Sequence, residues 1–112
     1  MKQLTLQFQP DSAAFVDVAM VREGMSALAL LNGVTESWVD EGDDEGPYVN
    51  FSFSSADIAA LWAHVQATMA ADTELGNALR AASMVMCEGE RGWDDYLLLY
   101  HFDPSVERDE LP

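Results

Sequence analysis

The sequence predicts a single α+β domain, and two stretches indicate this class most directly. Residues 3–9 alternate apolar and polar side chains, which is the period of a half-buried strand. Residues 47–69 begin with the same alternation and then change to apolar residues at helical spacing. A strand that leads directly into an amphipathic helix is typical of a sheet covered by helices.

The first strand is predicted over residues 3–9 and ends at a proline. A helix is then predicted over residues 13–31, with Asp11 or Ser12 as its N-cap. Residues 15–21 include three valines, so the first half of this helix has a strand as its alternative.

A second strand is predicted over residues 34–40 and a third over residues 48–53, joined by an acidic loop that contains two glycines and a proline. Ser54 and Asp57 have the spacing of a capping box, in its weaker Asp form. They predict the start of a helix that runs from residue 55 to about residue 71.

A shorter helix follows, with Asp72 or Thr73 as its cap and an end near Ala82. The last predicted elements are two strands, residues 84–88 and 96–102, that form a hairpin. The predicted order is therefore strand, helix, strand, strand, helix, strand, with one added strand. This is the order of a ferredoxin-like split βαβ fold with an additional C-terminal antiparallel strand.

The domain is expected to span residues 1–104, and residues 105–112 are expected to form a polar, frayed tail. A ferredoxin-like sheet carries its helices on one face only. The closing hairpin has apolar residues on both of its faces, so the uncovered face would expose an apolar patch. We therefore expect a homodimer that packs through the sheet.

The composition limits the class of partner. The chain has 112 residues with 20 acids against 5 lysines and arginines, a net charge of -15. Nucleic acids and anionic membranes both require a basic surface, so neither is expected as a partner. Apolar runs are too short for a membrane span or a signal peptide, and Cys87 has no second cysteine to pair with. These features indicate a cytoplasmic protein.

The most unusual local feature is a group of six acids within residues 36–45, next to a tryptophan. Its spacing does not fit a calcium-binding EF-hand loop, and no metal or other cofactor is predicted. Trp93 is the second tryptophan that lies beside acids near a predicted loop, and tryptophan is enriched at interaction hot spots. The candidate partner-binding residues are Glu36, Trp38, Asp40, Glu41, Asp43, Asp44, Glu45 and Trp93.

No catalytic motif is present around Cys87, His64 or the glycines. The function that we expect is that of a non-catalytic interaction protein, such as an inhibitor, an immunity-type protein or a regulatory protein, that binds a basic partner. The alternative is a small-molecule-binding domain or a cofactorless enzyme with a pocket between sheet and helices. The polar groups of that pocket would come from Tyr48, Tyr96, Tyr100 and His101.

Overall fold

One antiparallel sheet organises the computed structural model, which describes residues 1–13 and 15–111. Its strands lie in the order β2-β3-β1-β4-β5, and each neighbouring pair is antiparallel. They are β1 (Lys2–Phe8), β2 (Val34–Asp43), β3 (Pro47–Ser55), β4 (Ser83–Gly89) and β5 (Gly92–His101).

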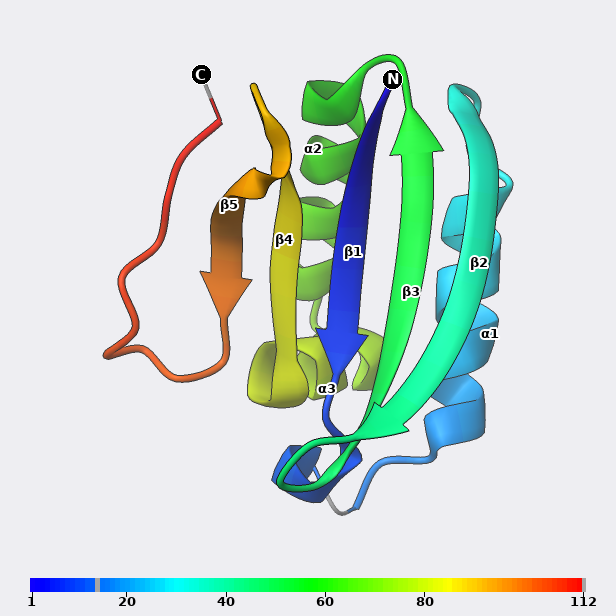
Figure 1. Ribbon diagram of the computed structural model, residues 1–112. Helices are drawn as coiled ribbons and strands as arrows, with labels where there is room; N and C mark the ends of the chain where they lie inside the picture. Colours follow the sequence, from blue (N-terminus) through cyan, green and yellow to red (C-terminus); the bar gives the residue numbers. More distant parts are fainter. Residues whose placement is uncertain (14, 112) are drawn as a thin grey trace.

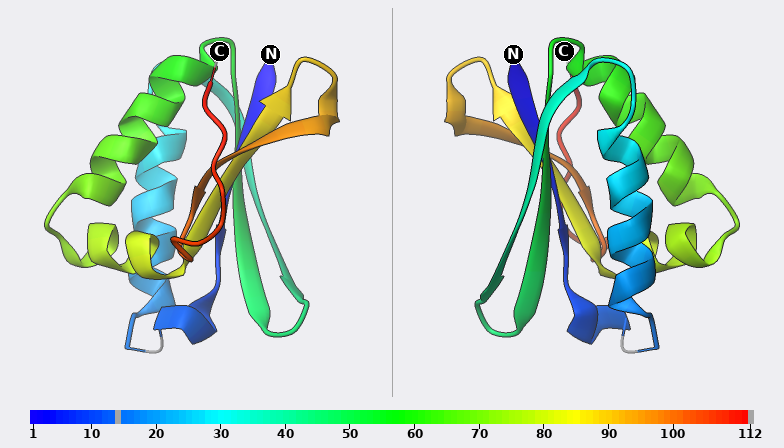
Figure 2. Two further views of the ribbon diagram at one scale, coloured as in Figure 1. Left: turned by 90° about the vertical axis from the view of Figure 1, so that its left-hand side faces the viewer. Right: turned by 90° about the vertical axis from the view of Figure 1, so that its right-hand side faces the viewer.

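Three α-helices accompany the sheet within the described residues: α1 (Val18–Ala29), α2 (Ile58–Ala70) and α3 (Glu74–Ala82). A short 3-10 helix, η1 (Pro10–Ala13), follows β1. The helices lie on one side of the sheet, and in the described part of the chain no element covers the other side (Figures 1 and 2). The Cα radius of gyration is 13.1 Å, which is typical of one compact domain of this length. The predicted α+β class is therefore confirmed.

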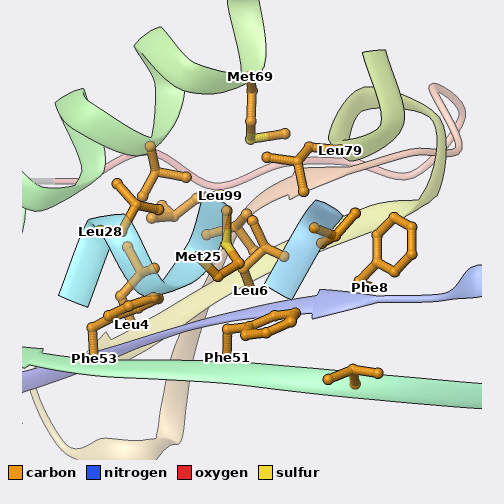
Figure 3. Close-up of a cluster of buried hydrophobic side chains, with 14 of the residues drawn as sticks. Leu4, Leu6, Phe8, Met25, Leu28, Phe51, Phe53, Met69, Leu79 and Leu99 are labelled. Atoms are coloured by element: carbon orange, nitrogen blue, oxygen red, sulfur yellow. The ribbon is translucent and has the colours of Figure 1, made fainter. Parts of the chain in front are cut away.

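The core fills the space between the sheet and the helices (Figure 3). Alternate residues of β1 point into it, because successive side chains of a strand face opposite sides of a sheet. The helices contribute residues at three- and four-residue spacing, as an amphipathic helix should. The main contributors are Leu4, Leu6 and Phe8 from β1, Phe51 and Phe53 from β3, Val21, Met25 and Leu28 from α1, Leu61, Val65 and Met69 from α2, and Leu79 from α3.

The first helix is shorter than the sequence predicts. Residues 10–13 form the 3-10 helix, and α1 begins only at Val18. Its N-cap is Asp17, whose side chain accepts a hydrogen bond from the backbone N–H of Ala19 at 2.9 Å. The predicted caps Asp11 and Ser12 are therefore wrong. The strand alternative also fails for Val18 to Val21, which are helical.

The second helix also starts later than predicted. Strand β3 continues to Ser55, and α2 begins at Ile58 with Asp57 as its cap. The Asp57 side chain accepts from the backbone N–H of Ala60 at 3.0 Å, while the Ser55 hydroxyl accepts from the N–H of Asp57 at 3.1 Å. The predicted capping role of Ser54 is wrong, because Ser54 is still paired in the sheet.

Two strand lengths differ from the prediction. Strand β2 continues to Asp43, so half of the predicted acidic loop is strand, and the turn to β3 is short. Likewise β5 begins at Gly92, four residues before the predicted start, because the closing hairpin has a tight turn at residues 90–91. The β2–β3 and β4–β5 hairpins are therefore longer than the hydrophobic pattern alone indicates.

The C-terminal tail runs beside β5 (Figure 1). Asp109 donates its backbone N–H to the carbonyl of Leu98 at 2.7 Å, and Arg108 donates to the carbonyl of His101 at 3.1 Å. Leu111 packs against the core. The sequence suggests a frayed end here, whereas the structure places these residues in contact with the domain.

Candidate interaction surface

The side of the sheet away from the helices, which we call the open face, is arranged in rows by the strand register. Paired residues on neighbouring antiparallel strands point to the same face. The middle row, from β2 to β5, contains Trp38, Ser52, Thr5, Met86 and Leu98. The next row contains Asp40, Asn50, Gln7, Met84 and His101.

Side-chain hydrogen bonds connect the second row from β2 to β1. The Asn50 amide donates to Oδ1 of Asp40 at 3.1 Å, and the Gln7 amide donates to Oδ1 of Asn50 at 3.1 Å. Gln9 then donates to Oε1 of Gln7, also at 3.1 Å. Since Asn50 and Gln7 each use a donor and an acceptor in this chain, their amide orientations are fixed by their neighbours. The chain of bonds holds the Asp40 side chain on the open face.

The centre of the open face is small and polar. The hydroxyls of Thr5 and Ser52 share a hydrogen bond of 2.8 Å, and Ser52 and Ser54 are buried by their neighbours. The larger apolar side chains of this face therefore lie toward its two edges, with Trp38 at the β2 edge and Met86 and Leu98 on the β4–β5 side.

Three of the predicted partner-binding residues come together at the β2 edge. Glu36, Trp38 and Asp40 alternate along the strand, so all three point to the open face. Trp38 is 37% exposed, and both acids are exposed. An accessible indole thus lies between two carboxylates on the open face.

The other predicted acids lie elsewhere on the same hairpin. Glu41 points to the helical side of β2, where it forms an ion pair with Arg22 of α1. Asp43 serves the turn, because its Oδ1 accepts from the backbone N–H of Gly46 at 3.2 Å. Asp44 and Glu45 are exposed at the tip, where Glu45 adopts a left-handed conformation with φ of 58°. The acids therefore surround the hairpin instead of forming one patch.

Trp93 is separated from these residues. It lies on β5, at the opposite edge of the sheet, and is 40% exposed. Four strand spacings of about 4.8 Å separate the two edges, so β2 and β5 are about 19 Å apart. The Trp93 indole N–H donates to Oε1 of Gln3 at 3.1 Å. The Trp93 side chain therefore extends across β4 toward β1, while Trp38 lies on β2 at the other edge of the sheet.

The four residues of the alternative pocket are also dispersed. Tyr100 lies on the helical side, where its hydroxyl donates to the carbonyl of Arg80 at 2.7 Å. Tyr48 pairs with Gly42 at the far end of the β2–β3 hairpin, on the open face. The alternation along β5 places Tyr96, which is 53% exposed, on the open face as well. His101 also lies there and stacks on Phe102. The structure does not bring these four side chains into one pocket between sheet and helices.

A groove of about 530 Å³ lies instead between η1, the start of α1 and α3. Its ionisable side chains are Asp17 and Glu74, and the Asp17 carboxylate is already used as the cap of α1. No residue of either predicted site lines this groove. Nothing in its lining resembles an acid–base pair or an activated nucleophile.

Most of the negative charge has no direct partner. Among the described residues, the pair between Arg22 and Glu41 is the one ion pair. Arg80 donates to the backbone carbonyls of Met69 and Ala71, at the end of α2. Arg108 lies over the Tyr100 ring, with its guanidinium carbon 4.5 Å from the ring centre. Among the described residues, no ion pair includes Glu36 or Asp40, the acids beside Trp38.

Cys87 is fully buried in the core, and this burial raises the pKa of its thiol. A raised pKa disfavours the reactive thiolate. Within residues 1–13 and 15–111, no three histidine, cysteine or acidic side chains gather as ligands of a metal ion would. No helix in this part of the chain is both long and apolar enough to cross a membrane.

Comparison of the chain with models of protein families, with curated proteins and with solved structures finds no match in any of the three.

The sequence does not single out the amides that support the site. The sequence pattern predicts only that three amides lie on the polar side of two strands: Gln7, Gln9 and Asn50. Their role depends on which strands are neighbours and in which register, and a single sequence does not contain that information. The available signal is the unusual choice of three amides at positions where a charged residue would serve solubility equally well.

Proposed function

We propose that this protein is a non-catalytic interaction protein that binds a basic partner through the β2 side of its open face. The observation that carries the proposal is the exposed Trp38 between Glu36 and Asp40. No cation pairs with these acids among the described residues. We define the three residues as the β2 site.

The chemistry of the β2 site suits a cationic surface. A tryptophan supplies a large rigid contact area and attracts lysine or arginine over its ring. The flanking carboxylates accept hydrogen bonds from the same cations. The remaining acids of the hairpin extend the negative potential and would increase the rate of encounter with a basic protein.

For the fold, we propose a ferredoxin-like split βαβ arrangement with β5 added outside β4. Two features support it: β3 lies between β1 and β2, and β1 lies between β3 and β4. The helices on one side of the sheet agree with it as well. The arrangement leaves one sheet face free for recognition, but it does not by itself imply a function.

We also propose a homodimer that packs through the β4–β5 side of the open face. This half presents Met84, Met86, Leu98, Trp93 and Tyr96. Strands β4 and β5 lie on the other side of β1 from β2. The buried, unpaired thiol of Cys87 is compatible with the reducing cytoplasm in which we place the protein.

The small-molecule alternative now depends on the groove between η1, α1 and α3, because the four predicted polar residues do not converge. A volume of about 530 Å³ is within the range of ligand pockets. A ligand of this groove would contact α3 and leave the β2 site untouched. Substitutions in the groove and substitutions in the β2 site therefore distinguish the two proposed functions.

An affinity capture from the source cell tests the proposal. The bait is the wild-type protein, compared with a variant carrying Glu36→Gln, Trp38→Ala and Asp40→Asn. The matched control carries Glu107→Gln and Glu110→Gln, two exposed acids of the tail. We expect a basic protein that is retained at low salt by the wild type and the control, and lost from the β2-site variant. Equal retention by all three baits would refute the assignment of the β2 site.

A further inference from the structure

The two outer edges of the sheet are not equivalent. At β5 the chain covers its own edge: Leu98 donates its N–H to Oδ2 of Asp109 at 2.9 Å and accepts from the N–H of Asp109 at 2.7 Å. Arg108 satisfies the carbonyl of His101 on the same edge. The tail therefore occupies hydrogen-bonding groups that another strand would otherwise use.

At β2 the edge is open. In the part of the chain that the structure describes, this strand pairs with β3 alone. Within the described residues, no hydrogen bond reaches the main chain of residues 35–43 from the other side. In an antiparallel pair, alternate residues direct their N–H and C=O groups away from the partner strand. A strand of ten residues thus leaves about five residues with outward main-chain groups.

The charge of β2 decides what can add to this edge. The strand carries Glu36, Asp40, Glu41 and Asp43, and in the described part of the chain only Glu41 has a cationic partner. A second copy of the chain, pairing β2 with β2, would bring these acids against the same acids. Like charges on facing strands are destabilising. Pairing of β2 with β2 of a second copy is therefore unfavourable, whereas pairing with an extended segment that carries lysine or arginine is favoured.

We propose that an extended basic segment of a partner protein binds by adding to β2 as a sixth strand. Its main chain bonds to the outward groups of β2, and its side chains alternate between the two faces. Cations on one face meet Glu36 and Asp40 beside Trp38, and cations on the other meet the side where Glu41 lies. This mode rests on the proposed function and specifies the conformation of the partner.

The test uses a synthetic eight-residue peptide of alternating lysine and threonine. Two matched peptides are N-methylated, one at every lysine amide and one at every threonine amide, so that their charges are unchanged. Strand addition needs the amides of only one edge of the peptide. We therefore expect the parent to bind, one methylated peptide to bind at least tenfold more weakly, and the other to retain most of the affinity.

Amide exchange supplies the second readout. In the complex, exchange at alternate residues of β2 should slow at least tenfold, whereas the Leu98 amide, already bonded to Asp109, should not change. Equal binding of all three peptides would overturn strand addition and leave a purely electrostatic surface, with the proposed function intact. Absence of peptide binding at low salt would also overturn strand addition. The proposed function would then be tested separately by the affinity capture.

Discussion

Asp109 closes the outer edge of β5 by bonding to Leu98 in both directions, through its backbone N–H and its carboxylate. Seven residues separate the end of β5 from this contact, so the chain turns back onto its own edge strand. The sheet consequently offers one protected edge and one open edge, and the open edge strand carries four acids, Glu36, Asp40, Glu41 and Asp43.

Replacing Asp109 tests this relationship. Asp109→Ala removes the acceptor of the Leu98 N–H and keeps the backbone bond. The expected loss of stability is about 0.5–1.5 kcal/mol, the usual net value of one hydrogen bond. Chemical denaturation measures the change, and exchange at the Leu98 amide should become faster. The matched control is Glu110→Ala, which should change neither. Equal effects of the two variants would show that the contact does not hold the tail.

The amide row on the open face is tested by Asn50→Asp. The substitution keeps the shape of the side chain but places a carboxylate beside Asp40 and removes the donor that now binds it. We expect a loss of about 1–2 kcal/mol, from a lost hydrogen bond and a like-charge pair. The loss should shrink with added salt. Gln66→Glu, an exposed site on α2, adds the same charge outside the row and serves as the control. Identical losses would contradict the role of the row.

The excess of acids predicts a salt dependence of stability. Residues 23–79 contain ten acids and no lysine or arginine, and one ion pair is present in the described structure. The carboxylates of the folded protein should therefore repel one another, and salt should screen this repulsion. Near neutral pH, Tm should rise when sodium chloride is increased from low to physiological ionic strength. A flat or falling Tm would mean that the acids are better compensated than the contacts indicate.

Light scattering tests the proposed homodimer. At micromolar concentration the wild type should have twice the monomer mass of 12.3 kDa. Met86→Lys places a charge in the middle of the apolar half of the open face and should give the monomer mass. Gln66→Glu, on the helical side, should remain dimeric. A wild-type mass of 12.3 kDa would refute the dimer.

The sequence was sufficient to predict the α+β class and the approximate place of every strand. It succeeded because the apolar period of β1 and β3 is clear and because both strands bury one face. The prediction was less accurate for β2, where the acids Glu41 and Asp43 read as a loop. A strand that is held by its partner β3 and is exposed at its edge shows no apolar alternation of its own.

The candidate site was predictable only in part. The alternation along β2 places Glu36, Trp38 and Asp40 on one face once the strand is recognised. The distance from Trp38 to Trp93 was not predictable, because it depends on the position of β4 and β5 beside β1. The same missing information explains why the sequence suggests one pocket for four residues that lie on both sides of the sheet.

The most direct test of the central claim, recognition of a basic partner by the acidic β2 hairpin, is the association rate measured as a function of salt. The variant carries Asp40→Asn, Glu41→Gln, Asp43→Asn, Asp44→Asn and Glu45→Gln. The control neutralises five exposed acids elsewhere, Glu23, Asp72, Glu90, Glu107 and Glu110. The ligand is the basic protein recovered by affinity capture. Electrostatic steering by the hairpin predicts a wild-type association rate that falls steeply with salt, a slower and nearly salt-independent rate for the hairpin variant, and a smaller change for the control. An association rate that neither the hairpin substitutions nor salt alters would contradict it.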